Sequence, residues 1–313
     1  MTYSSLFKQS IGLYLEGQYE QAYQLITEQM DSFKDFETHL YNLRYCTACM
    51  AGHKDLTIQI LKEAILEKGY WYSVDYLYQE EDLKSIRDTE EFKELAELCR
   101  QRELEARETA RPGLITIKPL NFKEENTYPL MMILHGNGQN ALIAKENWHS
   151  SANKDYLLAL PQSSQPQFSN SYIWTDYLKG IEEVKVHYAQ LLREYHIDQS
   201  KVIIGGFSAG TRASLYAVLT GAVEVRGLIL NGCWLPELKE WEPMFAALKE
   251  KGIKFYIICG DKDEISLDST IQLAELLKEK DFPYILHIID GMGHTYPENF
   301  ERYIEEAINF IMG

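Results

Sequence analysis

The sequence predicts an α/β domain with a mostly parallel sheet, preceded by an all-helical domain. Three observations support this prediction. The chain has 313 residues, enough for two domains of ordinary size. Helical periodicity without a single proline runs to about residue 108. After Arg111-Pro112-Gly113, short β-branched runs alternate with helical stretches. We therefore expect a helical domain over residues 1–110 and an α/β domain over residues 111–313.

The helical domain contains a segment that resembles the centre of a tetratricopeptide repeat (TPR), Gly17-Gln18-Tyr19-Glu20-Gln21-Ala22. Gly52 follows Gly17 by 35 residues, close to the period of that repeat, and precedes a helix expected over residues 54–66. We expect a TPR-like domain, and a helical bundle with two unrelated turns is the alternative. Five aromatic residues between positions 70 and 78 either line a binding groove or pack in the core, and both alternatives stay open. Its members are Tyr70, Trp71, Tyr72, Tyr76 and Tyr78.

In the second domain, short apolar runs typical of strands alternate with stretches of helical periodicity. Strands are expected over residues 114–117, 130–134, 156–160, 201–205, 227–230, 253–259 and 284–289. Helices are expected over residues 180–195, 209–219, 242–251, 267–280 and 297–312. This alternation predicts a mostly parallel sheet with helices on both faces, and ligands then bind at the carboxyl ends of the strands.

Composition excludes several classes of function. The chain has 31 Lys and Arg against 47 Asp and Glu, a net charge of −16, so we expect no binding to nucleic acid or to an anionic membrane surface. The first residues lack the basic and apolar regions of a signal peptide, and no stretch is as long as a membrane span. We therefore expect a soluble, cytoplasmic protein.

The cysteines suit reduced thiols better than a disulfide framework, because their number is odd and they are scattered. They are Cys46, Cys49, Cys99, Cys233 and Cys259. Cys46 and Cys49 form a lone C-x-x-C, with no second pair and no histidine at metal-ligand spacing. We expect these two thiols to pack on one helix face.

The most informative segment runs from Lys201 into Gly206-Phe207-Ser208-Ala209-Gly210 and on into a helix. A strand, Gly-x-Ser-x-Gly and a helix predict a nucleophile elbow, in which the positions two before and two after the serine must be small. Ser208 would be held in a strained conformation beside the first amides of the helix. The alternative is a glycine-rich turn without chemical meaning, and the motifs that accompany the segment argue against it.

The strand expected over residues 130–134 leads into His135-Gly136-Asn137-Gly138, which is similar to a His-Gly-x-Gly turn that supplies an oxyanion-hole amide. The backbone N–H groups of Asn137 and Ala209 are the expected donor pair. His135 is expected to stabilise the turn rather than act as a base, since it precedes the serine.

Two loops downstream carry the candidate acid and base. The strand over residues 253–259 ends in a loop with Asp261 and Asp263, of which Asp263 is preferred because Asp261 lies so close to Gly260 that it is suited to close the turn. The last strand ends in a glycine-containing loop that carries His294, so the three groups follow one another as Ser, Asp and His. We expect Ser208, Asp263 and His294 to form a catalytic triad.

With these motifs, residues 112–313 resemble the α/β-hydrolase superfamily, and most closely its phospholipase/carboxylesterase-like and dienelactone-hydrolase-like esterases. The finer likeness rests on residues 158–165, followed by Trp174-Thr175-Asp176. The resemblance implies a serine hydrolase that needs no cofactor and no metal. Six side chains flank the catalytic loops and either line an apolar acyl pocket or pack in the core. They are Trp148, Trp174, Cys233, Trp234, Met292 and Tyr296.

The expected function is that of a carboxylesterase, which cleaves a small-molecule carboxylic ester or thioester through an acyl-enzyme. A serine peptidase of the same fold is the first alternative, because the catalytic residues do not separate esters from amides. The second is a TPR-type protein-binding module with an accessory hydrolase domain, in which the helical domain binds a protein partner or a second copy of the chain. The acyl group cannot be deduced from the sequence, since its contacts lie on variable loops.

Overall fold

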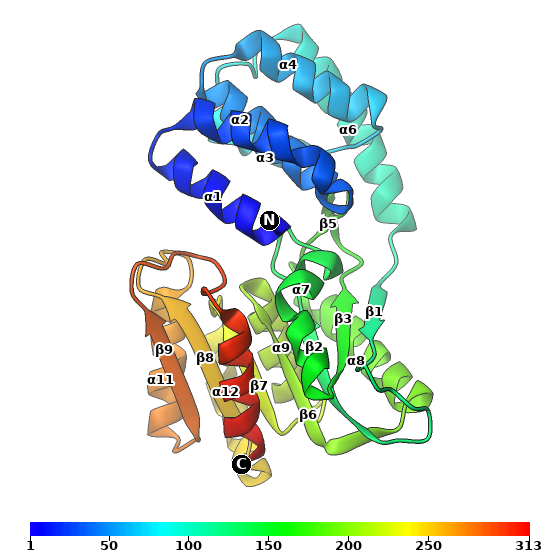
Figure 1. Cartoon of the computed structure of the whole chain (residues 1–313), viewed down its shortest axis with the longest axis vertical. Coiled ribbons are helices and arrows are strands. Elements are labelled where there is room, and N and C mark those ends of the chain that lie inside the picture. The colour runs from blue at the N-terminus through cyan, green and yellow to red at the C-terminus, as the bar shows by residue number, and fades with distance from the viewer. The chain divides into compact units, whose positions relative to one another are not determined.

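The computed structural model describes all 313 residues, and they divide into two compact units (Figure 1). The helical unit consists of Met1–Ala110 and Gln165–Tyr172, and the sheet unit consists of Arg111–Ser164 and Ile173–Gly313. The sequence-based division assigned residues 111–313 to one domain. The structure differs in one respect, because Gln165–Tyr172 leaves the sheet unit and packs with the helices.

The helical unit is built from six α-helices, each packed on its neighbours. The turns after the first and third helices contain Gly17 and Gly52, whose φ angles of +75° and +89° favour glycine. The helix expected over residues 54–66 ends at Lys62 and continues as a π-helical turn, Glu63–Glu67. The TPR-like character of the unit stays a prediction. The helices are α1 (Tyr3–Leu15), α2 (Tyr19–Gln29), α3 (Glu37–Met50), α4 (Lys54–Lys62), α5 (Val74–Gln79) and α6 (Glu90–Thr109).

The segment that joins the helical unit from the second half of the chain is a short hairpin, β4 (Pro166–Phe168) and β5 (Ser171–Tyr172). Its Phe168 pairs with Tyr72 in an antiparallel bridge and is only 6% exposed. Tyr72 is fully buried and Trp71 nearly so. Trp71 and Tyr72 therefore pack in the core of the unit and do not line a binding groove.

The sheet unit contains a seven-stranded sheet in the order β1-β3-β2-β6-β7-β8-β9. Only β1 runs antiparallel to its neighbour, and every other pair is parallel. Each of the seven strands expected from the sequence is present. They are β1 (Gly113–Ile117), β2 (Tyr128–Leu134), β3 (Leu157–Gln162), β6 (Ile197–Phe207), β7 (Gly227–Asn231), β8 (Lys254–Gly260) and β9 (Tyr284–Ile289).

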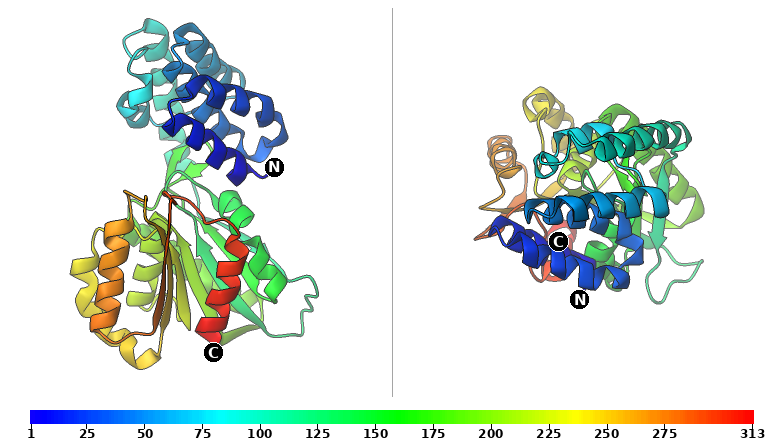
Figure 2. Two further views of the ribbon diagram at one scale, coloured as in Figure 1. Left: turned by 60° about the vertical axis from the view of Figure 1, so that its left-hand side comes forward. Right: turned by 90° about the horizontal axis from the view of Figure 1, so that it is seen from above.

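Helices cover both faces of this sheet (Figure 2). Successive residues of β2 point to opposite faces, so Met132 belongs to one core cluster and Met131 to the other. The helices α8 (Tyr177–Glu194), α9 (Ala209–Leu219), α10 (Leu238–Trp241) and α11 (Leu267–Glu279) contribute to the first cluster. The helices α7 (Ala141–Trp148) and α12 (Phe300–Met312) contribute to the second.

Three local features differ from the sequence-based expectation. Helix α7 was not expected, although Asn140 caps it by accepting a hydrogen bond from the Ile143 N–H at 2.9 Å. The expected helix over residues 242–251 is a 3-10 helix, and β6 begins four residues earlier than expected. No helix combines the length and the apolar character that crossing a membrane requires.

Candidate active site

Ser208 lies at the turn between β6 and α9 with φ 52° and ψ −122°, a conformation that non-glycine residues rarely adopt. Hydrogen bonds hold this turn from both sides. The Ser208 N–H donates to the Asn231 carbonyl at 3.0 Å, and the Thr211 hydroxyl donates to the Ser208 carbonyl at 2.6 Å. The strained backbone is therefore fixed by its surroundings, as a nucleophile elbow requires.

Gly206 and Gly210 lie so close to the backbone of β2 that no side chain fits at either position. A Cβ on Gly206 would lie 2.6 Å from the Leu134 carbonyl oxygen, and one on Gly210 would lie 2.2 Å from the same atom. Both distances are far shorter than van der Waals contact. The end of β6 and the start of α9 thus pack directly against the end of β2, and this close approach brings the Ser208 turn next to the His135–Gly138 loop.

Asp263 and His294 form a hydrogen-bonded pair at the carboxyl ends of β8 and β9. The His294 Nδ1 lies 2.8 Å from one Asp263 carboxylate oxygen and 3.0 Å from the other. Asp263 is 1% exposed, and burial alone would raise its pKa. Hydrogen bonds from His294 and Ser266 outweigh that effect and lower the pKa of the Asp263 carboxyl. The carboxylate therefore stays ionised and orients the imidazole.

Ser266 contacts Asp263 and was not among the residues predicted from the sequence. Its hydroxyl donates to one Asp263 oxygen, while its N–H and that of Ile265 donate to the other at 3.0 and 3.1 Å. An aspartate three residues before a serine at a helix start was the available signal, since such residues bond to nearby backbone N–H groups.

Asp261, the alternative acid, plays a different part. Its carboxylate accepts a hydrogen bond from the Gly291 N–H at 2.7 Å, so it ties the loop after β8 to the loop after β9. The same two loops approach each other closely at Gly260, where a Cβ would lie 1.8 Å from the Met292 carbonyl oxygen. Of the two candidate aspartates, only Asp263 contacts His294.

Asp263 and His294 lie on the same side of the sheet edge as Ser208. The His294 ring lies 4.7 Å, centroid to centroid, from the ring of Phe207, the residue that precedes Ser208. At the end of β7, a Cβ on Gly232 would be 3.3 Å from the His294 Cε1. The three predicted triad members therefore follow β6, β8 and β9 at the same carboxyl edge of the sheet.

The predicted oxyanion-hole residues lie on the two sides of this elbow. Ala209 is the first residue of α9, so its N–H has no acceptor within the helix and lies at the positive end of the helix dipole. The Asn137 side-chain oxygen accepts a hydrogen bond from the Trp174 N–H at 2.8 Å. The side chain of Asn137 is thus held on one side of the loop, and its backbone N–H is the group to consider as an oxyanion donor.

His135 is fully buried and both of its ring nitrogens are used by the backbone. Nδ1 donates to the Gly136 carbonyl at 2.8 Å, and Nε2 accepts from the Ser163 N–H at 3.3 Å. Burial lowers the pKa of the imidazole to about 4. This geometry gives His135 a structural place in the loop and leaves no nitrogen for proton transfer.

We expect a pH dependence of stability from His135. In the unfolded chain an imidazole has a pKa of about 6.5, so protonation favours unfolding, and stability is lost as the pH falls from 6.5 toward 4. The shift corresponds to a loss of about 3 kcal/mol in the free energy of unfolding across this range. Urea unfolding at several pH values, with His135→Gln as the comparison, measures it. If the free energy of unfolding fell equally with pH in the native protein and in His135→Gln, the loss of stability would not come from His135.

The six side chains that flank the catalytic loops divide into two groups. Trp148, Trp174 and Cys233 are at most 1% exposed and Met292 is 8% exposed, so they belong to the core. Trp234 and Tyr296 are half-buried. Only these last two retain surface with which to contact an acyl group.

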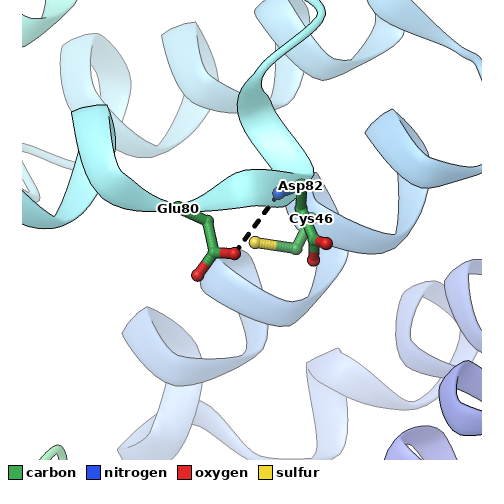
Figure 3. Close-up of side chains that lie close together, drawn as sticks. All are labelled: Cys46, Glu80 and Asp82. Carbon is green, nitrogen blue, oxygen red and sulfur yellow. Dashed lines mark hydrogen bonds between the residues drawn. The ribbon is translucent and has the colours of Figure 1, made fainter.

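One group of metal-ligating side chains lies in the helical unit, where Cys46, Glu80 and Asp82 bring ligand atoms within 4.8 Å of one another (Figure 3). Hydrogen bonds already engage the two carboxylates. Tyr14 donates to Asp82 at 2.5 Å, and the Asp82 N–H donates to Glu80 at 3.3 Å. Burial raises the pKa of the Cys46 thiol well above its usual range. The cluster is accounted for by packing and hydrogen bonds within the unit.

Comparison with known proteins assigns the family. A family model described as Phospholipase/Carboxylesterase matches residues 121–312, and one described as the A/B hydrolase-like, N-terminal domain matches residues 2–107. The chain belongs to the phospholipase/carboxylesterase family of α/β hydrolases and is an esterase-type hydrolase. The family was predicted from the elbow and its companion motifs, and that prediction is confirmed.

Solved structures share this architecture. An uncharacterized protein from Bacillus cereus ATCC 10987 is 37% identical, with 99% of each chain covered and a TM-score of 0.58. The esterase PE8 is 18% identical over 64% of this chain and 98% of its own, with a TM-score of 0.53, a likeness that shows the fold alone. No curated protein sequence matches the chain.

Proposed function

We propose that this protein is a serine carboxylesterase that cleaves carboxylic esters or thioesters through an acyl-enzyme. Ser208 is the nucleophile, His294 the general base and Asp263 the group that orients the imidazole. The observation that carries the proposal is the hydrogen bond between Asp263 and His294, at the same sheet edge as a serine held at positive φ. A buried carboxylate, an imidazole and a strained serine are the components of acyl transfer.

The proposed reaction has two halves. His294 Nε2 takes the proton of the Ser208 hydroxyl as Oγ attacks the ester carbonyl, and the tetrahedral oxyanion is stabilised by the N–H groups of Asn137 and Ala209. The intermediate collapses, the bond to the alcohol breaks, and the leaving oxygen receives the proton from His294. Water then attacks the acyl-enzyme by the same steps in reverse, which releases the acid and regenerates Ser208. All proton transfers run through the imidazole, so the mechanism uses only groups of this chain.

A fluorophosphonate probe followed by a substrate series tests the proposal. We expect the probe to label Ser208, and we expect hydrolysis of p-nitrophenyl esters to depend on acyl chain length, because the half-buried Trp234 and Tyr296 offer limited apolar surface. Faster turnover of aminoacyl amides than of matched esters would favour a peptidase. Absence of both labelling and turnover would contradict the proposal and favour the protein-binding alternative.

We further propose a reducing compartment, the cytoplasm, as the place of action. All five cysteines are free and buried, and Cys233 and Cys259 have thiols whose pKa is raised by burial. Such thiols are compatible with an environment in which disulfides do not form.

A further inference from the structure

Asn231 is the last residue of β7, which lies in the sheet between β6 and β8. Its backbone carbonyl accepts the Ser208 N–H at 3.0 Å. Its side-chain Nδ2 donates to the carbonyl of Thr295 at 3.3 Å, and Thr295 directly follows His294. One residue therefore contacts both the turn that carries the proposed nucleophile and the loop that carries the proposed base.

The amide of Asn231 is an unusual group for its position. The other residues of β7, Gly227–Leu230, are glycine or apolar, and the whole strand is buried. Asn231 is 0% exposed, and its Oδ1 has no hydrogen-bond partner. Burial of an unpaired amide oxygen destabilises a fold, and leucine would fill a similar volume without that cost. Stability of the strand therefore does not explain an asparagine here, whereas the contact with Thr295 does.

The orientation of this amide follows from its partner. If Oδ1 and Nδ2 exchanged places, an amide oxygen would face the Thr295 carbonyl oxygen, and two acceptors repel each other. The donor therefore faces the loop after β9. The loop itself is tightly turned at His294, because the Thr295 N–H donates to the Gly293 carbonyl at 2.9 Å. The Asn231 amide holds this turn from the sheet.

Phe207 supports the same loop from the neighbouring strand. It is paired in register with Asn231, and its ring lies 4.7 Å, centroid to centroid, from the rings of both His294 and Tyr296. Ring contacts allow sliding and rotation, whereas a hydrogen bond fixes the direction of a backbone group. Asp263 holds the His294 imidazole at Nδ1. The backbone from which that imidazole extends is held by the Asn231 amide.

We propose that Asn231 is a positioning residue for the esterase reaction. It holds the backbone of the loop after β9 so that the Nε2 of His294 faces the Ser208 hydroxyl. The catalytic part of this inference rests on the proposed function. The restraint acts within the sheet unit alone, through one hydrogen bond to the residue that follows the base.

Asn231→Leu removes the amide and keeps the approximate size and branching of the side chain. A displacement of about 1 Å between reacting groups can cost about 10²-fold in rate. We therefore expect kcat for p-nitrophenyl acetate to fall by about 10- to 100-fold, and KM to change by less than about twofold, because no acyl-binding surface is altered. The melting temperature should stay within about 5 °C of the native value, since the variant loses one hydrogen bond but also the unpaired Oδ1. A kcat within about twofold of the native value would overturn the proposal.

Tyr188→Phe is the matched control. The Tyr188 hydroxyl donates to the Glu224 carbonyl at 3.3 Å, the same distance as in the Asn231 contact. Glu224 lies in the loop before β7, at the opposite end of that strand. The control thus removes a side-chain donor from a backbone carbonyl away from the site, and its kcat should remain within about twofold of the native value. Equal losses of kcat in Tyr188→Phe and Asn231→Leu would mean that general destabilisation is the cause, and would overturn the proposal.

Hydrogen–deuterium exchange of the full-length variants tests the restraint without any substrate. Amides of residues 292–296 should exchange faster in Asn231→Leu than in the native protein, and at the native rate in Tyr188→Phe. Unchanged exchange in Asn231→Leu would overturn the inference even if the enzyme is an esterase. Conversely, faster exchange together with failed fluorophosphonate labelling of the native protein would uphold the restraint and reject the proposed function.

A second variant, Asn231→Ser, covers the case in which Asn231→Leu does not fold. Serine keeps a small polar side chain, but its hydroxyl is attached to Cβ and ends short of the Thr295 carbonyl. Exchange over residues 292–296 should rise, and kcat should fall with KM little changed. No change in either measurement would again overturn the proposal.

Discussion

Replacing Ser208 with alanine should abolish covalent labelling by a fluorophosphonate and lower kcat by about 10⁴-fold or more. The reason is chemical, since the variant lacks the oxygen that becomes acylated. Folding should be retained, because the elbow is held by the Ser208 backbone, through its N–H to Asn231 and its carbonyl to Thr211. Labelling is read by mass spectrometry of the intact protein, and turnover by release of p-nitrophenol.

The matched control is Ser200→Ala, which removes an exposed serine hydroxyl from the same strand, β6. This variant should be labelled and should turn over substrate like the native protein. Labelling of Ser208→Ala at another serine would show that the nucleophile has been misassigned.

The second large effect is expected at Asp263. In Asp263→Asn the side-chain amide can present its NH₂ group to His294 Nδ1, which favours the tautomer that cannot accept the serine proton. We expect kcat to fall by about 10⁴-fold, with KM little changed. Steady-state kinetics on one activated ester, with circular dichroism to verify folding, measure this effect.

Asp261→Asn provides the comparison within the same loop. The Asn side-chain oxygen can still accept the hydrogen bond from the Gly291 N–H, so the tie between the two loops persists. We expect less than about a tenfold loss of kcat. A larger loss in Asp261→Asn than in Asp263→Asn would reverse the assignment of the acid.

The predictable part of the fold rests on local patterns. The strands of the sheet core are β-branched runs bounded by turn residues, and such runs are recognisable without knowledge of their partners. The residues around Ser208 were informative for a similar reason. Gly206 and Gly210 are required by the close approach of β6 and α9 to the Leu134 carbonyl, a steric demand that the sequence records at two fixed positions.

The features that were missed depend on contacts between distant segments. Strand β6 begins early because Tyr128 pairs with Ile197 beyond a register shift, which the composition of residues 197–200 does not reveal. The link of Trp174 to Asn137 joins residues 37 positions apart. The hairpin at Gln165–Tyr172 carries ordinary loop composition, and only its packing places it with the helices.

That packing has a consequence for how the protein is made. A ribosome synthesises the chain from its first residue, so residues 1–110 leave the exit tunnel well before Phe168 exists. Until then Tyr72 lacks the strand residue with which it pairs in the finished molecule. The helical unit, although it lies first in the sequence, cannot be completed first. Its last segment, Gln165–Tyr172, is translated only after the first strands of the sheet unit.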